Sequence, residues 1–256
     1  MEFYMSNILS FSGGKDSTAM LHLMLEKGED IKAVLYCDMG DWEFPEMLEH
    51  IELVQEKTGV QITKCQLPHS LSYIAFHRKH YSVHGDGGIK YGLGWPSKHR
   101  RWCTRMKNDT LDYVKRRIGE GVACVGLAAD EIKRKKHPDK RYPLVEYGYT
   151  EQMCLDYCKK LGYTWGGLYD WQNRVSCWCC PLQSTTQLRN LRKHKPELWN
   201  KLIDMDALTL KHPYQYMDVG VFALDARFTL EENPHRTYPS RNYLHNSKVQ
   251  QSYAIK

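Results

Sequence analysis

The stretch Ser12-Gly13-Gly14-Lys15-Asp16-Ser17 lies between an apolar run, residues 7–11, and a helical pattern that ends before Gly28. Two adjacent glycines let the backbone turn its N–H groups inward, and the helix that follows adds the positive end of its dipole. Lys15 can neutralise phosphate charge, and the two serine hydroxyls can donate hydrogen bonds. A Walker loop has a longer spacing before its Lys-Ser/Thr pair. The stretch therefore predicts a phosphate-binding turn of another kind.

Short apolar runs alternate with helical patterns on both sides of this turn. We expect strands at residues 7–11, 31–36, 61–66 and 122–127, and helices at residues 17–27, 45–58, 107–118 and 150–161. Such alternation predicts an α/β fold with a doubly wound parallel sheet covered on both faces. We assign residues 1–170 to this nucleotide-binding domain. Residues 171–256, with a cysteine motif, form a small and mostly helical C-terminal part that packs on it.

Two regions depart from the alternating pattern. Between Tyr81 and Trp102 the glycines at positions 85, 87, 88, 92 and 94 favour a loop or lid. After the cysteine motif, one basic amphipathic helix is expected, with Leu188, Leu191, Leu198 and Leu202 on its apolar face.

Composition places the chain among ordinary globular proteins, with 42% hydrophobic and 26% charged residues. No run of 18 apolar residues occurs and no basic leader precedes one, so we expect a cytoplasmic protein with no membrane partner. The net charge of +6 permits an anionic partner without requiring one. Basic residues cluster at 98–107, 133–136 and 189–195, either as solvated surface or as phosphate contacts.

Nine cysteines without an export signal indicate thiols or metal ligands rather than disulfides. Five of them lie in apolar surroundings and are predicted core residues: Cys37, Cys65, Cys124, Cys154 and Cys158. Cys177 and Cys180 form a C-x-x-C pair, whose spacing lets two thiolates reach one metal, with Cys179 between them. Cys103 follows two arginines, whose cations favour a thiolate. The candidate metal ligands are Cys103, Cys177, Cys180 and Cys179.

Residues 10–17, Ser-Phe-Ser-Gly-Gly-Lys-Asp-Ser, resemble the PP-loop of the ATP pyrophosphatases, in the branch of the phosphoadenosine-phosphosulfate (PAPS) reductase-like proteins. The resemblance continues at residues 36–40 and 44–46, at residues 126–134, and at Pro143-Leu144, and it spans residues 6 to about 203. It implies an adenine nucleotide alpha-hydrolase-like, Rossmann-like sheet with ATP across the carboxyl ends of the strands.

A hypothetical mechanism for such a loop includes a set of nucleotide contacts and a Mg²⁺ ion. Lys15, Asp16 and Asp38 would be catalytic, with Mg²⁺ near Asp16 or Asp38. Contacts to ATP would come from Ser10, Ser12, Gly13, Gly14, Lys15, Asp16, Ser17, Asp38, Gly126, Lys133 and Arg134. The chain departs from the branch at Met39, where Thr is usual, and at Ala128 or Ala129, where Arg is frequent. Lys133 and Arg134 are the expected substitutes for that arginine.

The cysteine set is similar to that of the iron–sulfur members of the branch, in which an early cysteine and a later C-x-x-C hold a [4Fe–4S] cluster. Adenylylsulfate reductases have a Cys-Cys pair at the early position, whereas Thr104 follows Cys103 here. Either Cys179 supplies the fourth ligand, or one iron is left open, as in PP-loop tRNA thiolation enzymes. Zn²⁺ in a four-cysteine site is the alternative.

Three readings of the function follow. A sulfonucleotide reductase would need a later nucleophilic cysteine, and none follows Cys180; such reductases also tend to lose the Lys-Asp pair of the loop, which is intact here. A sulfate adenylyltransferase would keep the loop but lack the cysteine set. The third reading, which we favour, is an ATP-dependent adenylyl transfer with pyrophosphate release, coupled to cluster-based sulfur chemistry on a nucleic acid.

The favoured reading also sets the expected partners. They are an adenine nucleotide, a tRNA or DNA substrate, a sulfur donor or electron-transfer protein, and a second copy of the chain in a homodimer. A nucleotide-binding module with a structural zinc is the non-enzymatic alternative.

Overall fold

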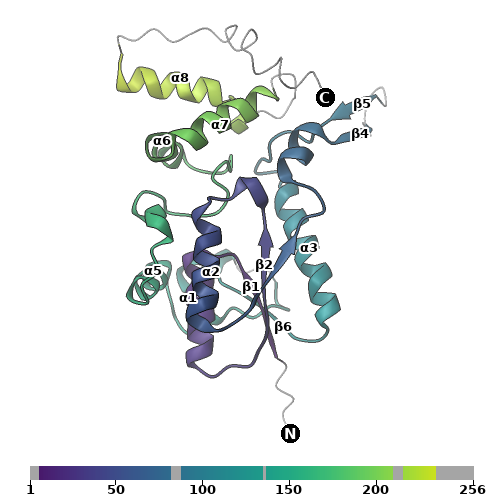
Figure 1. The fold of residues 1–256 in the computed structure, drawn as a ribbon, viewed down its shortest axis with the longest axis vertical. Helices are drawn as coiled ribbons and strands as arrows, with labels where there is room; N and C mark the ends of the chain where they lie inside the picture. The colour runs from purple at the N-terminus through teal and green to yellow at the C-terminus, as the bar shows by residue number, and fades with distance from the viewer. Residues whose placement is uncertain (1–5, 82–87, 135–136, 210–215, 235–256) are drawn as a thin grey trace. The chain divides into compact units, whose positions relative to one another are not determined.

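The computed structural model describes residues 6–81, 88–134, 137–209 and 216–234, and the chain divides into two compact units (Figure 1). The first unit comprises Met1–Ser70 and Cys103–Cys177, and the second comprises Leu71–Trp102 and Trp178–Lys256. Residues 71–102, which the sequence analysis placed in the first domain, therefore cluster with the C-terminal residues. Trp95 explains this grouping, because its ring packs edge-on against Tyr216 at 5.0 Å and its indole N–H donates to Asp206 at 2.9 Å.

A four-stranded parallel sheet forms the centre of the first unit, in the order β3-β2-β1-β6. Its strands are β1 (Asn7–Phe11), β2 (Ile31–Asp38), β3 (Ile62–Gln66) and β6 (Val122–Val125). Leu9 of β1 pairs in register with Val34 on one side and Cys124 on the other. The predicted α/β sheet is confirmed, and each strand begins within one residue of its expected start.

Helices cover both faces of this sheet, as Figure 1 shows. The helices α1 (Lys15–Glu26), α2 (Glu46–Thr58) and α5 (Glu151–Lys160) lie on one side, and α3 (Trp102–Ile118) lies on the other. Short turns complete the unit: η1 (Gly40–Trp42), η3 (Ala129–Arg134), α4 (Pro143–Glu146) and η4 (Trp165–Asp170). The expected helix ends hold: Gly59 stops α2 in the left-handed region, and the Thr150 hydroxyl caps α5 by accepting from the Met153 N–H.

The five cysteines predicted to be core residues, Cys37, Cys65, Cys124, Cys154 and Cys158, are all buried. They lie among fully buried aliphatic side chains such as Leu9, Leu21 and Leu35. Burial raises the pKa of the Cys37 thiol to about 11 and that of the Cys124 thiol to about 12, so both remain protonated at neutral pH.

The second unit contains two short strands, three α-helices and two short helical turns among its described residues. These are the π-helical turn η2 (Tyr73–His77), β4 (Lys79–Tyr81), β5 (Ile89–Tyr91), α6 (Thr185–His194), α7 (Pro196–Ala207), η5 (Tyr216–Asp218) and α8 (Val221–Glu232). None of the helices in the described part of the chain has the length and hydropathy needed to cross a bilayer.

Two expectations for this unit were wrong. The glycine-rich stretch is not only a loop, because it contains β5, which pairs antiparallel with β4 just before it; Gly85 and Gly87 lie outside the described residues. The basic amphipathic helix is two helices, since Pro196 lacks a backbone N–H and so begins α7 after α6 has ended at His194. Leu188, Leu191 and Leu202 are buried as predicted.

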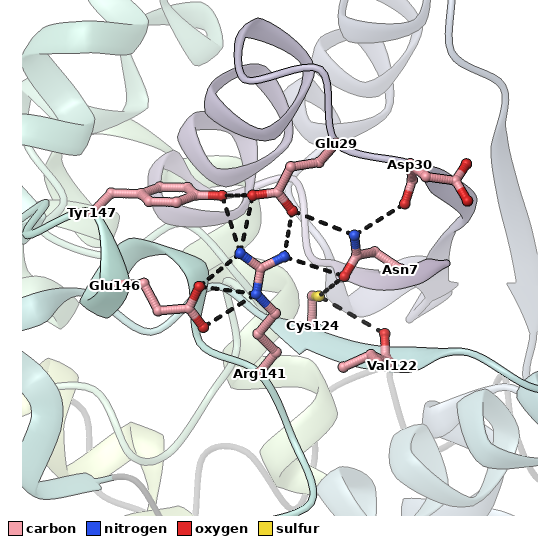
Figure 2. Close-up of polar contacts among 8 residues, drawn as sticks. All are labelled: Asn7, Glu29, Asp30, Val122, Cys124, Arg141, Glu146 and Tyr147. Atoms are coloured by element: carbon pink, nitrogen blue, oxygen red, sulfur yellow. Dashed lines mark hydrogen bonds and ion pairs between the residues drawn. The ribbon is translucent and has the colours of Figure 1, made fainter. Parts of the chain in front are cut away.

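Arg141 ties together the amino-terminal edge of the sheet (Figure 2). Its backbone extends the sheet beside Cys124, and its guanidinium donates to both oxygens of Glu29, to Glu146 at 2.7 Å, and to the Asn7 side-chain oxygen at 3.3 Å. The Tyr147 hydroxyl also donates to Glu29. Burial opposes ionisation of Glu29, but these donors lower its pKa below the ordinary value.

We predict that Arg141→Gln lowers the free energy of unfolding by about 2 kcal/mol, because Glu29 would keep its partly buried charge without its bidentate partner. The figure is below that for a fully buried pair because the Arg141 side chain is 27% exposed. Urea denaturation measures it. The control is Arg105→Gln, which breaks an exposed pair with Asp109 and should change the free energy by less than about 0.5 kcal/mol. Equal effects of the two substitutions would contradict the assignment.

Candidate functional site

Residues 12–17 connect the carboxyl end of β1 to the first turn of α1. Gly13 has a φ of +75°, and a Cβ at this position would lie 2.9 Å from the Met47 methyl carbon. The Ser12 N–H donates to the Ser17 hydroxyl at 3.2 Å, and that hydroxyl donates to the Gly14 carbonyl at 3.0 Å. The turn thus has the strand–turn–helix context that favours anion binding at a helix N-terminus.

Three successive carbonyl groups of this turn are held inside the unit. The Gly13 carbonyl accepts the Trp165 indole N–H at 2.7 Å, the Gly14 carbonyl accepts the Thr18 N–H at 3.0 Å, and the Lys15 carbonyl accepts the Cys158 thiol at 3.4 Å. In a trans peptide the N–H points opposite to the carbonyl of the same peptide plane. Fixing these carbonyls therefore directs the N–H groups of residues 14, 15 and 16 to the opposite side of the chain, where the Lys15 N–H donates to the Tyr169 hydroxyl at 2.9 Å.

The edge of the sheet that carries this turn also holds two other predicted contact residues. Asp38 ends β2, and its carboxylate accepts from Lys64 at 2.9 Å and from the Gly40 N–H at 2.8 Å. Gly126 follows β6, and a Cβ there would lie 3.1 Å from the Ser17 backbone N. Because β2 and β6 flank β1 on opposite sides, the strand order reverses beside this turn. Open α/β sheets bind ligands at such a switch point.

Lys15 and Asp16 form a half-enclosed charged pair at the start of α1. The Lys15 side chain is only 8% exposed, and its amine lies 3.2 Å from Asp16 and 3.5 Å from Glu151 of α5. Burial raises the pKa of the Asp16 carboxyl, and the Lys15 amine partly offsets this rise. Asp16 Oδ1 is buried and accepts no hydrogen bond from any described residue. This oxygen is therefore suited to a cation or to a donor on a ligand.

Aromatic rings support the turn from inside the unit. His50 of α2 stacks on Trp165 with ring centroids 4.5 Å apart, and its Nε2 is hydrogen-bonded with the Thr18 hydroxyl at 3.0 Å. Tyr163 meets the His50 ring edge-on at 5.1 Å. Burial lowers the pKa of His50 to about 3, so the imidazole is neutral at physiological pH. The support is thus an uncharged layer.

Tyr169 reaches the turn from η4, whose backbone is unusual. Trp165, Gly166 and Gly167 all have positive φ, which for Trp165 is a rare conformation. The Tyr169 hydroxyl accepts the Lys15 N–H at 2.9 Å, and its ring packs edge-on against Trp165 at 4.8 Å. Burial raises the pKa of Tyr169, so the hydroxyl keeps its proton. That proton can be donated to a ligand on the turn.

The cysteine motif begins beside the same turn. Cys177 pairs by an antiparallel bridge with Glu43, which follows η1, and the Val175 carbonyl oxygen lies 3.9 Å from where a Gly14 Cβ would be.

Cys103 lies in the first turn of α3 and is partly exposed. Cys179 is fully buried and Cys180 partly exposed, and both belong to the second unit. Among the described residues, no three His, Cys, Asp or Glu side chains are gathered as a metal site. The metal-ligand set stays a prediction.

The other predicted contact residues lie around this edge. Ser10 is within β1, where it pairs with Leu35 and Val125. Lys133 is exposed on η3; the Arg134 side chain, Lys135 and Lys136 lie outside the described residues. Met39, which is buried, and Asp38 line a small pocket of about 160 Å³ at the carboxyl ends of β2 and β3.

Sequence reasoning missed Tyr169, Trp165, His50 and Glu151. The Gly166-Gly167 pair marks a turn with positive φ, but no local pattern indicates that Tyr169 contacts a residue 154 positions earlier. Cys158 was predicted as core and is buried, yet its bond to the Lys15 carbonyl also went unforeseen.

Comparison with known proteins gave one family. The sequence model described as "Phosphoadenosine phosphosulfate reductase domain" matches residues 6–183, from β1 to just beyond the cysteine motif. A search of curated proteins returned no match.

We predict that the neutral His50 makes the protein sensitive to acid. The folded-state pKa of about 3 lies below the ordinary 6.5, so unfolded chains bind a proton that folded chains do not as the pH falls below 6.5. The stability contribution is present above pH 6.5 and is lost toward pH 3. Between pH 7 and pH 5 the free energy of unfolding should fall by about 2 kcal/mol more than in His50→Gln. Urea titrations at both pH values measure the difference, and parallel behaviour of the two proteins would refute the prediction.

Proposed function

The chain belongs to the phosphoadenosine phosphosulfate reductase domain family, and from this premise we propose that it binds ATP and transfers the adenylyl group with release of pyrophosphate. The observation that carries the proposal is the turn of residues 12–17, with its carbonyls held inward and Lys15 and Asp16 beside it. Such a turn suits a di- or triphosphate rather than a single carboxylate, because the positive N-terminal end of α1 is combined with the Lys15 cation.

The proposed reaction is an attack by an acceptor oxygen on the α-phosphorus of ATP. The bond between the α-phosphorus and the bridging oxygen breaks, and pyrophosphate leaves with the electron pair. The N–H groups of the turn and the Lys15 amine would stabilise the negative charge that develops on pyrophosphate. The Lys15 amine, now shared between Asp16 and Glu151, would exchange one carboxylate for a phosphate oxygen.

Mg²⁺ fits the proposed site at Asp16. The buried Oδ1 of Asp16 takes no described donor, and hard cations prefer carboxylate oxygens. Asp38 is the weaker candidate, since Lys64 and the Gly40 N–H already engage its two oxygens. When bound, the ion would neutralise phosphate charge and orient the leaving group.

Two further groups complete the proposed nucleotide contacts. The Tyr169 hydroxyl, which accepts from Lys15, would donate its proton to a phosphate oxygen. The pocket next to Met39 and Asp38 is the candidate for part of the nucleoside. Lys133 and Arg134 on η3 remain proposed phosphate contacts by the resemblance of residues 126–134 to the family.

The second part of the proposal concerns sulfur. We propose that Cys103, Cys177 and Cys180, with Cys179 as the optional fourth ligand, hold a [4Fe–4S] cluster. Two observations support this: the C-x-x-C spacing, and the bridge between Cys177 and Glu43 near the carboxyl end of β2. A bound cluster would supply sulfur chemistry to an activated nucleic acid, tRNA or DNA, with an external sulfur donor or electron-transfer protein.

The test of the first part uses ATP, Mg²⁺ and candidate tRNA or DNA, with pyrophosphate and AMP measured. Lys15→Ala should lower pyrophosphate release by about a hundredfold or more, and Tyr169→Phe by a smaller factor, since each removes a group that stabilises the leaving charge. Lys32→Ala is the matched control, because Lys32 lies at the amino end of β2, where its amine donates to the Glu120 carbonyl. Release that survives Lys15→Ala would exclude the assignment.

The test of the second part is the absorption spectrum and metal content of protein purified without oxygen. A cluster gives a broad visible band with iron and sulfide in similar amounts, and Cys103→Ser should diminish both. Cys65→Ala, a buried core position, should lower thermal stability but keep the band. A colourless protein that contains zinc would replace the cluster with a structural metal, and Cys103→Ser would then lower the melting temperature.

A further inference from the structure

Most of the chain's net positive charge comes from residues 71–102. This segment contains six Lys and Arg residues and one Asp, so it carries a net +5 of the chain's +6. The rest of the chain is therefore almost neutral. The segment also contains three tyrosines and two tryptophans. Cations interleaved with aromatic side chains are the composition of nucleic-acid-binding surfaces.

The strands β4 and β5 place part of this composition on one exposed face. Lys79 pairs with Tyr91, and Tyr81 pairs with Ile89. Directly paired residues share a face of an antiparallel ribbon, so these four side chains lie on the same side. Tyr81 is 68% exposed, Tyr91 62% and Ile89 49%. We call these four residues the ribbon face; its two tyrosines form a diagonal pair roughly 7–8 Å apart.

Backbone hydrogen bonds and a packed aromatic pair fix the segment that carries the ribbon face. The N–H groups of Gly92, Leu93 and Gly94 donate to the carbonyls of Arg78, Ile74 and Ala75 at 2.8–3.0 Å. Gly92 has a φ of +68°, and a Cβ there would lie 2.2 Å from the Ala75 carbonyl oxygen, so only glycine fits. Beneath, Phe76 of the π-helical turn η2 packs edge-on against buried Trp95 at 5.1 Å. Exposed tyrosines on such a base are held ready for a ligand.

The cations of the ribbon and those of α6 are in different electrostatic states. Arg189 is paired with Glu231 at 2.7 Å, and Arg192 with Asp225 at 2.8 Å, both on α8. The predicted basic helix is thus largely neutralised by its neighbour. Arg78, Lys79 and Lys90 form no ion pair with a carboxylate of the described residues. Their charge is available to a polyanion.

We propose that the ribbon face binds single-stranded nucleic acid, with bases stacked on Tyr81 and Tyr91 and a phosphate contacted by Lys79; Lys90, which pairs with His80, lies on the opposite face and adds only to the local positive potential. Exposed tyrosines offer bases a stacking surface that a paired duplex cannot use, which favours single strands. The inference deepens the proposed function by giving the acceptor nucleic acid a binding surface. It concerns binding alone and does not depend on the adenylyl transfer.

The test is fluorescence anisotropy of the full chain with a labelled 20-nucleotide single strand, in DNA and in RNA form, and with the matching duplex. Tyr81→Ala with Tyr91→Ala should weaken single-strand binding by tenfold or more, because each tyrosine removes a stacking contact. Lys79→Gln should lower the slope of log affinity against log salt by about 0.7. The controls are Tyr113→Ala, an exposed tyrosine of α3, and Lys160→Gln, an exposed lysine of α5; both should bind as the parent does.

Unchanged affinity in the double tyrosine variant would overturn the proposal, and so would tighter binding of the duplex or binding only to anionic lipid vesicles. Calorimetry with ATP on the same variants separates this result from the proposed function. Ribbon variants that bind ATP normally but lose the oligonucleotide support the ribbon assignment. A parent protein that binds the oligonucleotide but no ATP would refute the proposed reaction and leave the ribbon assignment standing.

Discussion

The candidate site depends on where the carbonyl groups of Gly13, Gly14 and Lys15 find their hydrogen bonds. An indole, a backbone amide and a thiol each take one of them inside the unit. Because the peptide group is planar, satisfying the carbonyls internally also orients the amides. The donor groups come from η4, α1 and α5, so much of the first unit must be folded before the turn adopts this conformation.

The sequence was sufficient for the strands of the first unit and for the position of the turn. Apolar periodicity and the stops at Gly28, Gly59 and Gly162 located α1, α2 and α5 within about two residues, whereas α3 begins at Trp102, five residues before its expected start. It was insufficient for the layer that supports the turn, because Trp165, Tyr169 and Cys158 act over more than 140 residues of chain. No periodicity encodes such pairing. The division of α6 from α7 was readable from Pro196 and was overlooked.

Net charge proved a poor guide until it was located in the structure. The arginines of α6 looked like a polyanion-binding surface in the sequence, but carboxylates of α8 engage them. The ribbon, which the glycine pattern had presented as a lid, is where cations and exposed tyrosines come together. The cations of α6 and those of the ribbon differ in their neighbours. A run of basic residues in the sequence gives the number of cations, but only the fold shows which of them are paired with carboxylates.

The clamp around Arg141 lies at the amino-terminal edge of the sheet, one strand length from the turn that follows β1. The contacts that stabilise the sheet and the proposed ligand site therefore lie at opposite edges of one sheet. An inherited change at the carboxyl edge can alter ligand preference while the clamp keeps the scaffold intact. Because of this separation, substitutions that change ligand specificity at the carboxyl edge need not lower the stability that the Arg141 contacts provide.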